Sequence, residues 1–138
     1  MDMKYTLCLT LLLATSLAAH GGDFVVIANA SLTDRNISTS DLKQIYLGTK
    51  TSLDGQHVEP VIAQSGPFHE QFVSLCLGKT EAGLRNYFRN LVFSGKGSMP
   101  RSFATSAEVV SFVSRTPGAI GYVDSEANLT GVTKLTVH

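Results

Sequence analysis

The sequence predicts an α/β protein in which a mixed sheet is flanked by helices. Short apolar runs of strand length alternate with segments whose apolar residues recur at three- and four-residue intervals. Such alternation is typical of helices packed against a sheet. Glycine and proline mark the boundaries between these segments, and we find no repeat, low-complexity run or linker that would divide the chain. We therefore expect residues 20–138 to form a single domain.

The first strand and the first helix are indicated by residues 24–48. Residues 24–27 form a continuous apolar run, which suits a strand covered on both faces. A helix should follow Ser38, because Asp41 lies three residues later and the serine can cap the first turn. Gly48 suits the position just after the last turn of that helix.

The second strand and the second helix come next. Asp54-Gly55 marks a turn, and residues 58–63 form a strand in which Pro60 indicates an irregular or edge position. Pro67 is well placed in the first turn of a helix that ends at Gly78. Its expected apolar face is made of Phe68, Phe72, Val73, Leu75 and Cys76.

Two further helices and two strands complete the prediction. Thr80 should cap a helix that carries apolar residues at helical spacing as far as Val92. Thr105 and Glu108 have the spacing of a capping box, and Pro117 cannot continue the helix that they begin. The strands are expected at residues 119–123 and 132–137, the last with one exposed face.

Residues 1–19 are expected to be a secretory signal peptide. Lys4 precedes a short apolar run at residues 7–13, and small residues at 16–19 offer a cleavage site. The run is too short to span a membrane, which takes about 20 residues. The alternative is a buried N-terminal helix. The mature chain, residues 20–138, would be periplasmic or secreted, without a membrane span.

Composition excludes several kinds of function. The chain has 11 basic and 11 acidic residues, whereas proteins that bind nucleic acid carry a basic excess. Only Cys76 would remain after cleavage, so no internal disulfide can form, and its apolar neighbours predict burial. The histidines have no metal-ligand spacing, and no catalytic grouping stands out. We expect neither an enzyme nor a cofactor or metal.

Five phrases of the sequence, taken in order, resemble a known family. They are residues 25–29, 42–48, 60–72, 91–97 and 117–123. Together they are similar to the substrate-binding component of phosphate ABC transporters, in the type II periplasmic binding protein superfamily. Full-length members have two lobes that close on an anion, and this chain resembles the second lobe alone. The resemblance therefore implies one lobe of that fold.

The resemblance also implies a site for a small, phosphate-like anion. In the family, a loop at the start of a helix donates backbone N–H groups and hydroxyls to phosphate, and helix N-termini favour anions. The equivalent loop points to Ser65, Gly66, Phe68 and His69 as ligand-binding residues. Pro67 removes one donor, no arginine is near in sequence, and Glu70 adds a negative charge.

Two functions from different classes remain open. The first is an exported module that binds a small anion at this helix start. The second is a ligand-free structural or interaction module of the cell envelope, in which the segment around residue 65 is simply a helix start. The partner would then be an envelope protein or a second copy of the chain, with Phe68 and Tyr122 as candidate contacts. Burial in the core is the alternative for both residues and the more common outcome. His69 is expected to be either an anion contact or an ordinary exposed residue.

Overall fold

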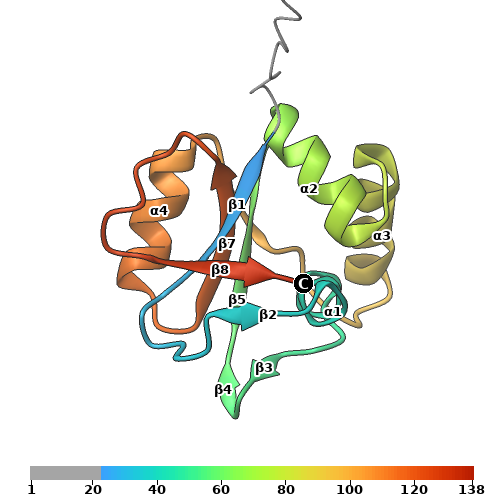
Figure 1. Cartoon of the computed structure of the whole chain (residues 1–138). Helices are drawn as coiled ribbons and strands as arrows, with labels where there is room; N and C mark the ends of the chain where they lie inside the picture. Colours follow the sequence, from blue (N-terminus) through green and yellow to red (C-terminus); the bar gives the residue numbers. More distant parts are fainter. Residues whose placement is uncertain (1–22) are drawn as a thin grey trace, which may run out of the picture.

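The computed structural model describes residues 23–138, and its centre is one mixed sheet of six strands (Figure 1). The order across the sheet is β2-β8-β1-β7-β5-β6. These strands are β1 (Phe24–Ala28), β2 (Asn36–Ile37), β5 (Glu59–Ala63), β6 (Arg101–Phe103), β7 (Ala119–Asp124) and β8 (Thr133–Val137). The predicted signal peptide, residues 1–19, lies outside the described residues.

Strand pairing confirms that the sheet is mixed. Strand β1 is antiparallel to both β7 and β8, whereas β5 is parallel to β7 and β6. The short β2 runs parallel to β8. A separate hairpin of β3 (Ser52–Leu53) and β4 (Gln56–His57) turns at Asp54-Gly55, where both residues have positive φ, as the sequence predicts.

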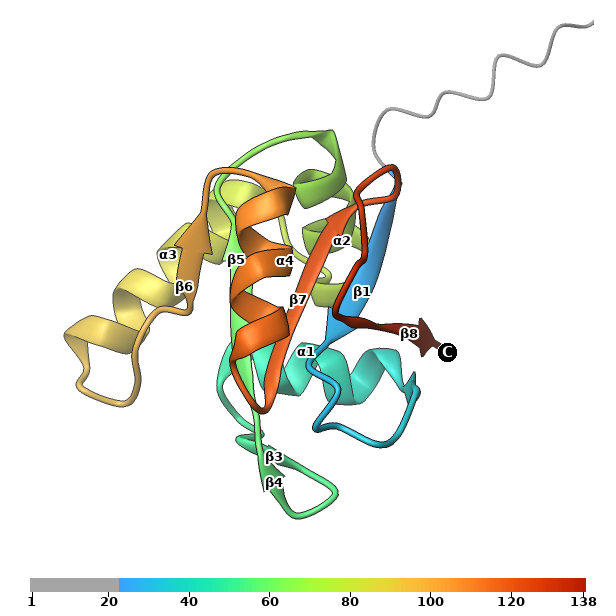
Figure 2. The same ribbon diagram turned by 90° about the vertical axis from the view of Figure 1, so that its left-hand side faces the viewer.

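Helices cover both faces of the sheet (Figure 2). They are α1 (Thr39–Leu47), α2 (Pro67–Leu77), α3 (Glu81–Phe93) and α4 (Ser106–Arg115). The residues of α1, α2 and α3 share one hydrophobic cluster with the sheet, and those of α4 share the other. The predicted α/β class is therefore confirmed, and the core has one layer of side chains on each side of the sheet.

The predicted helix caps are present in the structure. The Ser38 side chain accepts the Asp41 N–H at 3.0 Å, and Thr80 accepts the Gly83 N–H at 3.0 Å. Thr105 and Glu108 form the complete capping box of α4. Because these bonds satisfy donors that the first turn leaves unpaired, the starts of α1, α3 and α4 follow from local sequence.

At Pro60 itself, strand β5 has the edge position that the sequence predicts, although the strand as a whole lies inside the sheet. The strand lies between β7 and β6 and is not an edge strand. Glu59 and Pro60 pair with β7, and pairing with β6 begins only at Val61. At Pro60 the neighbour on the β6 side has not yet started, so the missing N–H of proline interrupts no pairing there.

The buried face of helix α2 differs from the predicted apolar face at two positions. Leu75 is 65 % exposed, whereas His69 is 2 % exposed. The buried face includes His69, Phe72, Val73 and Cys76, which lie at intervals of three and four residues. Leu75 falls outside that stripe, and helical geometry places its side chain in solvent.

The core should make the protein sensitive to alkali. Burial raises the pKa of Tyr46 and Tyr122, and it raises the pKa of Cys76 from 9.0 to about 11. These groups ionise more easily in the unfolded chain, so stability is intact below pH 9 and falls as the pH rises through the alkaline range. Melting temperatures measured across this range should fall together with ionisation of the buried tyrosines, followed by their ultraviolet absorbance. A melting temperature that stays level while those tyrosines ionise would contradict this picture.

Candidate functional site

The loop between β5 and α2 is positioned by the sheet. The Gln64 N–H donates to the Phe103 carbonyl at 2.9 Å, which continues the pairing of β5 with β6. Gly66 then has φ 114° and ψ 160°, a conformation that only glycine adopts without strain. Helix α2 begins at Pro67, at the same end of the sheet as the start of β1 and the end of β7 (Figure 1).

Main-chain donors gather at this helix start. The first intrahelical bond of α2 runs from the Glu70 N–H to the Gly66 carbonyl at 3.1 Å. The N–H groups of Phe68 and His69 lie before that bond, and the start of α2 has no side-chain cap. Within residues 23–138 the N–H groups of Ser65 and Gly66 have no protein acceptor either. Four N–H groups and the partial positive charge of the helix end are thus available to an anion.

The His69 side chain does not belong to this donor set, and the expectation of an exposed ring or a ring that contacts an anion is wrong. Its Nδ1 lies 2.5 Å from the Tyr122 hydroxyl, and its Nε2 lies 3.1 Å from Glu81 Oε2. The Tyr122 oxygen also accepts the Ala63 N–H at 3.1 Å. In this arrangement the Tyr122 O–H donates to Nδ1, and Nε2–H donates to Glu81. Both ring nitrogens are occupied by the protein, so only the backbone of His69 can serve a ligand.

In Phe68, as in His69, the side chain packs against the protein and only the backbone N–H is available to a ligand. Its ring is half-buried and packs edge-on against Tyr122, with ring centroids 6.2 Å apart. Tyr122 is 0 % exposed, because it lies on the interior strand β7 and stacks on Phe72 at 3.7 Å. Tyr122 is therefore a core residue, the outcome that the sequence favours over a partner contact. The Phe68 ring packs against the core, and its N–H has no protein acceptor among residues 23–138.

Charge near the site comes from residues distant in sequence. Arg85 of α3 lines a small cavity of about 170 Å³ together with Gln64, His69 and Glu81. Its guanidinium lies 3.7 Å from Glu81 Oε1 and is 65 % exposed. Sequence reasoning missed this residue, because α3 is brought beside the loop only by packing on α2. Glu70 is exposed in the first turn of α2 and opposes an anion there.

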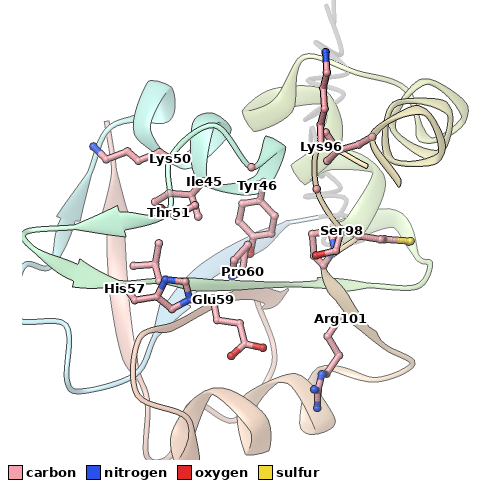
Figure 3. Close-up of a pocket in the computed structure, with 16 residues that line it drawn as sticks. Ile45, Tyr46, Lys50, Thr51, His57, Glu59, Pro60, Lys96, Ser98 and Arg101 are labelled. Carbon is pink, nitrogen blue, oxygen red and sulfur yellow. The ribbon is translucent and has the colours of Figure 1, made fainter. Parts of the chain in front are cut away.

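A second cavity, of about 350 Å³, lies at the other end of β5 (Figure 3). Lys50, Lys96 and Arg101 line it, and Figure 3 shows their charged ends pointing in different directions. Lys50 is bound to Asp41 at 3.0 Å. Because these charges do not converge on one point, this cavity is a weaker candidate for an anion than the helix start.

We also searched the described residues for a metal site, a reactive cysteine and a membrane-spanning helix. Among residues 23–138 there is no group of three or more side chains that could hold a metal ion. Cys76 is buried, and burial raises its pKa to about 11, so it is a thiol and not a thiolate at neutral pH. The described helices are all too short or too polar to cross a membrane.

Comparison with known proteins identifies the fold. No protein-family model and no curated protein matches the sequence. Among solved structures, a phosphate ABC transporter substrate-binding protein from Clostridium perfringens with bound phosphate matches with a TM-score of 0.64 at 17 % identity. A phosphate transport receptor from Vibrio cholerae gives 0.64 at 16 %, and PstS from Borrelia burgdorferi gives 0.61 at 18 %.

The three matches cover 85 %, 85 % and 86 % of this chain. They cover only 45 %, 46 % and 48 % of the respective neighbours. The chain has the fold of about half of a phosphate-binding protein. The resemblance drawn from the five sequence phrases is thereby confirmed at the level of the fold. The first two neighbours are described as a substrate-binding protein and a transport receptor.

Proposed function

We propose that this protein is an exported, single-lobe binding module that holds a small anion such as phosphate at the start of α2. The anion would accept hydrogen bonds from the N–H groups of Ser65, Gly66, Phe68 and His69, with the Ser65 hydroxyl beside them. The observation that carries the proposal is this set of unpaired donors at an uncapped helix start. A neighbour of the same fold that holds phosphate supports it. The proposal of export rests on the pattern of residues 1–19.

The residues at the start of α2 also determine how tightly an anion should bind. Pro67 lacks an N–H, and Glu70 carries a negative charge in the first turn. Binding should therefore be weak, with a Kd of the order of millimolar, or about −4 kcal/mol. Phosphate and sulfate should both bind, because main-chain donors recognise charge and size more than the identity of the central atom.

Glu70→Gln should strengthen binding. Removing one negative charge beside the helix start is worth about 0.3–1 kcal/mol, or roughly a two- to fivefold lower Kd. Calorimetric titration with phosphate and sulfate, together with thermal stabilisation by the same anions, measures this. Asp54→Asn is the matched control, since Asp54 is an exposed acid on the hairpin turn at the far end of β5.

The outcomes of this titration separate the two functions. Heat and stabilisation that increase in Glu70→Gln and not in Asp54→Asn support the anion site. Absence of both at millimolar phosphate and sulfate would count against it. Gly66→Ala should weaken binding, because φ 114° strains alanine and displaces the N–H groups.

The second candidate function is a ligand-free interaction module of the envelope. The inward-facing ring of His69 and the proline at the first helical position favour it, because both remove groups that could contact an anion. Its partner would be an envelope protein or a second copy of this chain. This function predicts that the protein retrieves a partner from an envelope fraction and shows no response to anions.

A further inference from the structure

One end of the molecule combines exposed apolar side chains with positive charge. We call it the basic tip, and define it as the outer face of α3 and the connection to β6, residues 85–101. Residues 92–99 are all exposed, and Phe93 is 87 % exposed. Val92 is 53 % exposed and Met99 is 50 % exposed. Figure 2 shows the connection from α3 to β6 projecting from the body of the protein.

Charge is segregated onto this end of a chain that is neutral as a whole. Residues 82–107 contain four basic residues, Arg85, Arg89, Lys96 and Arg101, and no acidic residue. The rest of the chain has seven basic and 11 acidic residues. Within α3, Arg85, Arg89 and Phe93 follow each other at intervals of four, so they lie along one face of the helix.

Acidic groups near the basic tip are few. Glu81, at the start of α3, is bound to His69 and also lies 3.7 Å from the guanidinium of Arg85. Glu59 is the single acidic residue among those that line the cavity shared by Lys96 and Arg101. The Arg101 guanidinium lies 5.2 Å from the centre of the Phe112 ring, which fixes part of its side chain. Arg89 and Lys96 have no acidic partner among residues 23–138, so their charges are free to meet an external partner.

We propose that the basic tip docks on the surface of a bilayer that contains anionic phospholipid. Charge complementarity selects an anionic partner, and basic residues beside an anionic surface favour binding additively. The apolar side chains protrude and do not line a groove, so they suit a fluid interface that can close around Phe93, Val92 and Met99. Proteins that lie on a membrane surface without crossing it commonly combine exposed aromatic and apolar side chains with nearby basic residues, as this tip does.

The test uses the chain as recovered from a host that exports it, mixed with phosphatidylglycerol-rich or pure phosphatidylcholine vesicles. Sedimentation should show binding to the first and little binding to the second, with strong weakening by salt. Phe93→Ser, and separately Arg89→Glu with Lys96→Glu, should lower the partition coefficient at least about tenfold. Leu75→Ser is the matched control, because Leu75 is 65 % exposed on α2, outside the tip.

A second readout follows from the absence of tryptophan in the sequence. Phe93→Trp places a single reporter at the tip, and its emission should shift to shorter wavelength with phosphatidylglycerol vesicles. Leu75→Trp should not shift. Because none of these substitutions touches a buried side chain, the variants should fold like the parent.

The outcomes are distinct from those of the anion titration. Gly66→Ala should bind vesicles like the parent, since the start of α2 is not part of the tip. Loss of vesicle binding in Gly66→Ala would instead mean that the lipid phosphate occupies the α2 site, and would overturn the proposal. Absence of vesicle binding, or equal loss in Phe93→Ser and Leu75→Ser, would also overturn it, and an acidic protein surface would then be the better partner for the tip.

Discussion

Gly118→Ala is expected to lower the free energy of unfolding by about 3 kcal/mol or more. Gly118 has φ 79°, and a Cβ built there would lie 2.2 Å from the His57 carbonyl oxygen. Its N–H donates to the Ser31 hydroxyl at 2.9 Å, and its carbonyl accepts the Glu59 N–H at 2.9 Å. The obstacle is the backbone of His57, so the start of β7 must move away from the end of β4 to make room. A drop in melting temperature of about 10 °C should result.

Gly55→Ala is the control that separates the two causes. Gly55 also has φ 79°, but a Cβ there would meet nothing within 4 Å. It should therefore report the conformational strain alone, about 1 kcal/mol. Denaturant unfolding of both variants measures the difference. Equal losses in the two variants would contradict the close approach of Gly118 to the backbone of His57.

Tyr122→Phe is expected to lower the free energy of unfolding by about 2–4 kcal/mol. The ring can still stack on Phe72, but the hydroxyl that serves two buried groups is gone. The Ala63 N–H loses its acceptor and His69 Nδ1 loses its donor. A buried polar group without a partner costs more than the net value of the bond that it made, so the effect should be large for one oxygen atom.

Tyr46→Phe is the matched comparison for the loss of stability in Tyr122→Phe. Tyr46 is as buried as Tyr122, but its hydroxyl donates to the carbonyls of Val61 and Ile120. Carbonyls on neighbouring strands can retain other donors, so the loss should be about 1 kcal/mol. Tyr122→Phe should also weaken anion binding, because His69 anchors the first turn of α2. If Tyr46→Phe costs as much as Tyr122→Phe, the hydroxyl of Tyr122 has no special part in holding the helix start.

Features that depend on residues close in sequence could be predicted well. The caps at Ser38, Thr80 and Thr105, and the turn at Asp54-Gly55, are decided by side chains within three residues of the backbone they serve. Local rules fix them because few alternatives compete over that distance. The α/β class followed from the alternation of such elements.

Features that depend on contacts between distant segments could not be predicted. His69 looked exposed because it is polar and begins a helix, yet its partners Glu81 and Tyr122 are 12 and 53 residues away. Arg85 reaches the candidate site only because α3 packs beside α2. Pro60 indicated an irregular or edge position, but local sequence did not show that the strand lies inside the sheet and that the staggered start of β6 creates this position.

The start of α2 is where the sequence and the fold disagree most about function. The backbone of Ser65, Gly66, Phe68 and His69 keeps free donors, whereas the side chains of Phe68 and His69 turn into the core. An anion would thus be held by main-chain groups, which no residue pattern reveals directly. Glycine at position 66 is the residue that makes this loop geometry accessible.

Amide resonances followed by ¹⁵N NMR during titration with phosphate show whether the anion lies at the start of α2. An anion bound there should produce saturable shifts at Ser65, Gly66, Phe68 and His69, larger in Glu70→Gln and unchanged in Asp54→Asn. Amides at the cavity near Lys50 and Arg101 should stay in place. Shifts confined to that cavity, or no saturable shift at the start of α2, would contradict the account.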